Sequence, residues 1–151
     1  MTQASVAASA VIRAPASRVY RILADYRQHH PRIVPPEYFR TIEVEEGGIG
    51  AGTRTRIEMR VLGITKHATH IIREPEPGRV LEEVDTSGFS TTTFVVDPAE
   101  NGASANVSIR TTFAVRAGPL GAIERFVTAS VLRRIYAKEL ARLSTYAATL
   151  P

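Results

Sequence analysis

Cysteine is absent from the 151 residues, which excludes a disulfide framework, a thiolate zinc site and a cysteine nucleophile. Tryptophan is also absent, and only five phenylalanines and two methionines are present, so few large side chains are available to fill an interior. No hydrophobic run approaches the ~20 residues of a membrane span, and residues 1–10 carry no basic leader. We therefore expect a soluble, unprocessed, cytoplasmic protein.

The charge balance is basic but dispersed. The formal net charge is +4, and the arginines are scattered among acidic residues without forming a basic tail. Such a pattern is typical of a solvated surface, so no specific nucleic-acid partner is predicted. The hydrophobic content of 44% and the charged content of 23% are ordinary for a globular protein, and the length suits a single domain over residues 1–151.

The first quarter of the chain predicts a strand, a helix and a bent connector. Residues 5–13 alternate in polarity and end beside Pro15, which is well placed in the first turn of a helix. Apolar residues at helical spacing then predict an amphipathic helix from Pro15 to about Gln28. Three prolines follow, so residues 29–38 are expected to form a bent connector, with a small helix as the alternative.

The middle of the chain has strand periodicity throughout. Six segments with period-two character are separated by glycine- and proline-rich turns: residues 39–46, 53–62, 66–73, 79–86, 90–97 and 105–115. Such short connections predict antiparallel neighbours. From Leu120 to Leu150 the period becomes helical, and the predicted fold class is α+β: a curved antiparallel sheet wrapped around a long C-terminal helix.

The apolar face of this long helix changes direction along its length. Counting 100° per residue places Ile123 and Val127 on one side, and Tyr136, Leu140 and Leu143 on nearly the opposite side. One interpretation is a kink, or two parts of one core. The other is that the C-terminal part packs on the sheet while the N-terminal part covers a cavity.

Three segments resemble one family. The sequence IRAPASRVYRILAD from Ile12, IREPEPGRVL from Ile72 and LARL from Leu140 resemble the START-like superfamily, in particular its polyketide cyclase/dehydrase branch. This resemblance implies a helix-grip domain that binds lipids, sterols, polyketides or other hydrophobic molecules, with a minority of members acting as cyclases or dehydratases. Many relatives place a tryptophan ahead of a proline where this chain has His30 before Pro31.

Three functions follow from this reading. The leading one is binding or transport of a small hydrophobic ligand in an internal cavity, by a monomer or homodimer without a cofactor. The second is a cyclase or dehydratase with His70, His30 or Tyr38 as acid or base. The third is a partner-binding module. His67 and His70 are three apart on a predicted strand and make a poor metal pair, so no metal is predicted.

The expected cavity lies between the N-terminal half of the long helix and the sheet. Its predicted lining residues are Ile57, Met59, Val61, His70, Phe94, Ile109, Phe113, Ile123, Phe126, Val127 and Ser130. A tryptophan at Ile109 is expected to fill the space. One choice is open: His70 and Ala68 face inward if Ile72 does, and otherwise the alternate residues of that strand line the cavity.

Overall fold

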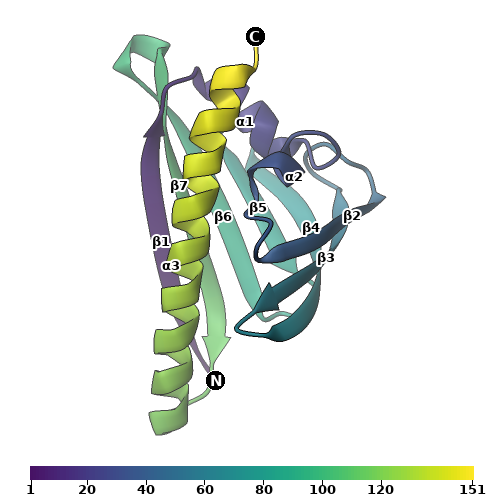
Figure 1. Cartoon of the computed structure of the whole chain (residues 1–151), viewed down its shortest axis with the longest axis vertical. Coiled ribbons are helices and arrows are strands. Elements are labelled where there is room, and N and C mark those ends of the chain that lie inside the picture. The colour runs from purple at the N-terminus through teal and green to yellow at the C-terminus, as the bar shows by residue number, and fades with distance from the viewer.

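A computed structural model describes all 151 residues as a curved seven-stranded antiparallel sheet crossed by one long helix (Figure 1). The elements follow the chain in this order: β1 (Thr2–Ile12), α1 (Ala16–Ala24), α2 (His30–Ile33), β2 (Phe39–Glu46), β3 (Arg54–Val61), β4 (Ile64–Glu76), β5 (Val80–Asp85), β6 (Ser90–Ala99), a 3₁₀ turn (Glu100–Gly102), β7 (Ser104–Val115) and α3 (Gly118–Thr149). The predicted fold class is confirmed.

The sheet is a meander closed by the first strand. The strand order is β1-β7-β6-β5-β4-β3-β2, so each strand from β2 to β7 pairs with its neighbour in sequence. The strand β1 pairs along its whole length with β7, from Thr2 opposite Val115 to Ile12 opposite Ala105. Side chains of successive residues point to opposite faces, so this register fixes which residues face α3.

The helix α1 is shorter than its sequence pattern predicted. It ends at Ala24 because Asp25 is extended, and the Asp25 carboxylate accepts hydrogen bonds from the backbone N–H groups of Arg27 and Gln28. Such a side-chain turn competes with continuation of the helix. The expected bent connector contains the single helical turn α2, which begins at His30 and has Pro31 in its first turn.

The long helix α3 covers only part of the sheet. Its main sheet contacts are with β1 and β7, and it also touches α1 and α2. The C-terminal half buries Ile135, Tyr136, Leu140, Leu143 and Ala147, whereas most of the large apolar side chains of the first turns are exposed. None of the helices has the length and hydropathy that a membrane-crossing segment needs.

Candidate functional site

Two polar rows cross the middle of the inner face of the sheet. The strand pairing places Glu83, Thr92 and Thr111 side by side on β5, β6 and β7. His70 and Asp85 pair in the adjoining row, on β4 and β5. On the side toward α1 and α2, the next row is apolar and fully buried: Leu81, Phe94 and Ile109. On β4 to β6 the polar rows thus mark the edge of the hydrophobic core, which on β7 continues past them to Phe113 and Val115.

His30 reaches this boundary from the first residue of α2. Its side chain is stacked on Tyr26, with ring centroids 4.4 Å apart, and meets the edge of Phe94. Nδ1 lies 2.8 Å from the carbonyl oxygen of Leu23, so Nδ1 donates and Nε2 carries the lone pair. Burial lowers the pKa of His30, against the raising influence of the Glu83 charge, and nearby His70 lowers it further. A neutral imidazole with a free Nε2 results.

Two glutamates face Nε2 of His30. Glu83 Oε1 lies 3.5 Å away and Glu139 Oε1 lies 3.9 Å away. Glu83 also accepts a hydrogen bond of 2.7 Å from the Tyr26 hydroxyl, and burial raises the pKa of that hydroxyl. Glu139 belongs to α3 and is 4% exposed. Burial, followed by the Glu83 charge, raises the pKa of Glu139 well above its ordinary value, which favours the protonated, uncharged form of this carboxyl group.

A chain of hydroxyl groups continues the polar cluster toward β6. The Tyr136 hydroxyl is hydrogen-bonded to Thr111, and Thr111 is hydrogen-bonded to Thr92 at 2.7 Å. Burial raises the pKa of Tyr136, which therefore stays protonated. Of these three residues only Thr92 is partly exposed, so it connects the buried hydroxyls to the accessible part of the inner face.

The cluster of His30, Glu83, Glu139, Tyr26 and Tyr136 brings together groups able to accept and donate protons. Neutral His30 offers a basic nitrogen, and Glu139, in the protonated form that burial favours, offers an acidic proton beside it. A pair whose pKa values are shifted by burial into complementary neutral forms is typical of sites that hold or move a proton. No group of three histidine or acidic side chains has the arrangement of a metal site.

The three residues predicted as acid–base candidates lie in different environments. His30, in the segment predicted to form a bent connector, is buried in the cluster. His70 lies on the same face as fully buried Ile72, which settles the open choice of face for β4. Tyr38 instead packs beneath Lys138, whose Nζ lies 5.3 Å from the ring centroid.

The predicted lining residues do not form one cavity. Phe94, Ile109 and Phe113 belong to the packed core, and Ile57 is also buried. Met59, Val61 and Ser130 are partly exposed. Ile123, Phe126 and Val127 are exposed on the side of α3 opposite its buried stripe, because the helical rotation carries them there. The structure therefore does not bring these three residues to the sheet face.

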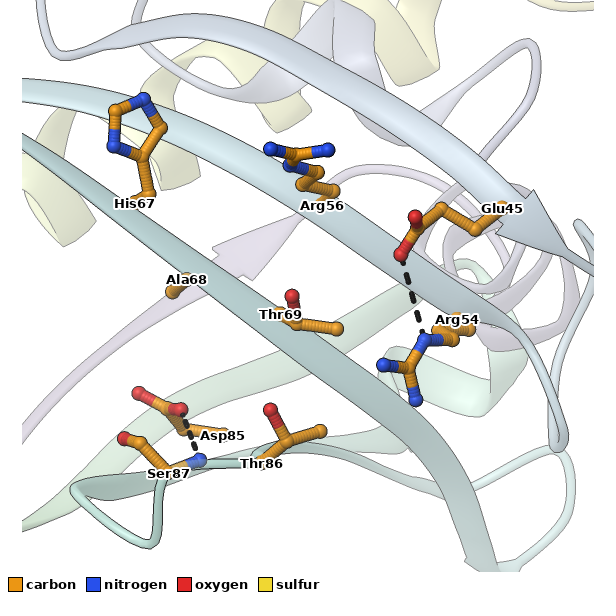
Figure 2. A pocket seen from close by; sticks show the side chains of 9 residues that line it. All are labelled: Glu45, Arg54, Arg56, His67, Ala68, Thr69, Asp85, Thr86 and Ser87. Atoms are coloured by element: carbon orange, nitrogen blue, oxygen red, sulfur yellow. Dashed lines mark hydrogen bonds and ion pairs between the residues drawn. The ribbon is translucent and has the colours of Figure 1, made fainter.

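A hollow lies elsewhere, along β3 and β4 and the start of the β5–β6 connection (Figure 2). Its volume is about 430 Å³, and its lining is polar: Glu45, Arg54, Arg56, His67, Ala68, Thr69, Asp85, Thr86 and Ser87. A second hollow of about 390 Å³ lies against the end of α3 and includes Arg32 and Tyr146. Neither contains a predicted lining residue.

Sequence reasoning missed Glu83, Glu139, Tyr26 and Tyr136 as site residues. Two signals were present in the pattern. Glu139 interrupts the apolar stripe of α3 between Tyr136 and Leu140, and alternation on β5 places Glu83 on the same face as Leu81. A carboxylate on an apolar face needs a partner, and this requirement could have identified both glutamates.

Comparisons with known proteins agree with this architecture. Residues 3–148 match the family model described as polyketide cyclase/dehydrase and lipid transport. No curated protein matches the chain. The solution structure of the KanY protein superposes with a TM-score of 0.84 at 24% identity, covering 98% of this chain and 99% of that one.

Two further solved structures have the same fold. The Zhui aromatase/cyclase from Streptomyces gives a TM-score of 0.80 at 19% identity, with 97% of this chain and 94% of that one covered. A START superfamily protein from Mycobacterium smegmatis gives 0.74 at 14% identity, with 97% and 99% covered. These identities show the fold alone. The family match extends through nearly the whole chain, so the protein belongs to the polyketide cyclase/dehydrase and lipid transport family.

Proposed function

We propose that the protein binds a small amphipathic molecule against the inner face of β3, β4 and β6, beside α3. The observation that carries this proposal is the uneven cover of that face. Under α3 the inward side chains of β1 and β7 are largely buried, whereas Met59, Ala68, His70, Ser90 and Thr92 are only partly buried. A partly uncovered face next to a packed core can accept a ligand without displacing that core.

The two ends of this surface favour different parts of a ligand. Partly buried Met59 and Leu132 pack at the margin of the core and suit an apolar body. The opposite end reaches Thr92, Glu83 and His70, which suit a hydroxyl or carbonyl group. The family description, which names polyketides and lipids, agrees with a ligand of this mixed character.

The contact between His30 and Glu139, whose raised pKa favours its protonated form, supports a second candidate function. Acid–base transformation of the bound molecule, as in cyclisation or dehydration, needs one group to accept a proton and another to donate one. Native mass spectrometry of protein purified from its own host would identify a co-purifying molecule. Loss of water from that molecule during incubation with the wild-type protein, but not with a His30→Gln variant, would support transformation over simple binding.

The binding proposal is tested by placing a large side chain on the proposed binding surface. Met59 is partly exposed on the inner face, so Met59→Trp is expected to occupy the space and to abolish binding of an environment-sensitive apolar dye while the melting temperature holds. Arg60→Trp is the matched control, because Arg60 follows Met59 on β3 and points to the outer face. Equal dye binding by the two variants would contradict the proposed location.

A further inference from the structure

The connections of the sheet lie at two opposite ends of the molecule. Because β2 to β7 form an antiparallel meander, the β3–β4, β5–β6 and β7–α3 connections share one end. The β2–β3, β4–β5 and β6–β7 connections share the other end. Figure 1 shows the first turns of α3 projecting at the same end as the β3–β4 hairpin.

Exposed apolar side chains gather at only one of these ends. Ten large hydrophobic side chains of the protein are exposed, and seven lie at or beside the connections of the first end: Leu62, Ile64, Phe89, Leu120, Ile123, Phe126 and Val127. Phe126 is 72% exposed and Ile123 is 61% exposed. We call these seven residues the apolar end. The opposite end contributes only two such side chains: Ile49, and Val11, which pairs with Asn106 beside the β6–β7 connection. A concentration of this kind marks an interaction surface.

The exposed charges near the apolar end that form no ion pair are positive, and the Asp85 carboxylate at this end is buried. Arg60, Lys66 and Arg125 are exposed and form none of the ion pairs of the structure. Glu124, in the first turns of α3, is neutralised by Arg116. The nearby Glu58 carboxylate faces His67 at 3.1 Å. The surface therefore combines projecting apolar side chains with cations that lack acidic partners.

We propose that the apolar end docks on the surface of an anionic lipid bilayer. Apolar side chains of a peripheral protein enter the boundary between headgroups and acyl chains, while neighbouring cations attract anionic headgroups. A second copy of the chain fits less well: two such ends face to face would gather the free Arg60, Lys66 and Arg125 of both copies without an exposed free carboxylate to balance them. The docking is independent of the proposed ligand-binding surface.

The experiment is flotation of the full chain with vesicles made of equal parts phosphatidylcholine and phosphatidylglycerol. The wild type is expected to float with these vesicles, to float far less with pure phosphatidylcholine, and to detach as salt is raised. The double variant Ile123→Gln/Phe126→Gln is expected to lower the partition coefficient at least about tenfold. Lys66→Gln and Arg125→Gln are each expected to lower it about fivefold.

Ile49→Gln is the matched control, because it removes an equally exposed apolar side chain from the opposite end. It is expected to float like the wild type. All replaced side chains are exposed, and unchanged circular dichroism melts would establish that the variants are folded. Absence of wild-type flotation, or equal flotation of the double variant, would overturn the proposal. So would a wild-type dimer that the double variant dissociates, because the apolar end would then be an interface between copies.

Discussion

Replacing Glu139 by glutamine should change how the stability of the protein depends on pH. Glu139 is 4% exposed, and its pKa in the folded protein is raised well above 4.5 by burial and by the Glu83 charge. Above pH 4.5 the unfolded chain loses the Glu139 proton while the folded protein keeps it. The folded state then holds more protons than the unfolded state, so the free energy of unfolding falls by about 1.4 kcal/mol per pH unit until the folded pKa is reached.

His30 has the opposite effect on the pH dependence of stability, and this effect is confined to pH values below 6.5. Its pKa in the folded protein is lowered from 6.5, so below pH 6.5 the unfolded chain gains a proton that the folded protein does not. His30 therefore makes stability rise with pH up to 6.5, where this contribution ends. Above pH 6.5 the His30 contribution is constant, so any further fall of stability with pH that comes from this pair is due to Glu139.

Urea denaturation between about pH 5 and 8 separates these contributions. The difference in stability between Glu139→Gln and the wild type is expected to grow in favour of the variant by about 1.4 kcal/mol per pH unit while Glu139 stays protonated in the folded state. Glu83, Tyr26 and His30 are present in both proteins, so their contributions to the pH dependence of stability cancel to first order in the difference. Glu43→Gln, at an exposed position without an ion pair, should show no such growth. Parallel curves for Glu139→Gln and the wild type would refute the reasoning.

Two further changes test the packing. Ile109→Trp is expected to lower the free energy of unfolding by about 1 to 3 kcal/mol in urea denaturation, because Ile109 is 1% exposed within the core. An unchanged or raised free energy of unfolding would contradict this and would support the cavity that the sequence predicts there. Gly121→Ala is expected to lower the melting temperature, because a Cβ at this buried position would overlap the carbonyl oxygen of Arg116. Ala122→Ser, one residue later and exposed, should leave the melting temperature unchanged.

The strands and the long helix were predictable because their signals are local. The segment 39–46 coincides with β2, and the predicted start of the long helix at Leu120 differs from the observed one by two residues. Ile109 and Phe113, predicted on the sheet face toward the long helix, are buried on one face of β7 together with Val107. Periodicity and turn chemistry carry this information without reference to the rest of the chain.

The polar cluster was not predictable in the same way, because it depends on contacts between distant segments. His30 is buried because Tyr26 stacks on it and because Glu83 and Glu139 converge from β5 and α3. The sequence showed that the first turns of α3 have an apolar side that points away from the apolar side of its C-terminal half. It did not show whether the sheet or the solvent lies on that side. Ile123 and Val127 could have covered a cavity only if the sheet extended to their side of the helix, and the helix lies on β1 and β7 through its opposite side.

The pairing of β1 with β7 has a consequence for how the chain acquires its fold. Thr2 is hydrogen-bonded into the ladder opposite Val115, and α3, which follows β7 directly, packs on β1 as well. The first strand therefore has neither its ladder partner nor its covering helix until the last third of the chain is present. Contacts between such distant segments carry a large loop-closure entropy and slow folding. During synthesis, the apolar face of β1 therefore stays uncovered until β7 and α3 have been made. Pairing of β1 with β7 and docking of α3 are expected to occur together as the final cooperative step of folding.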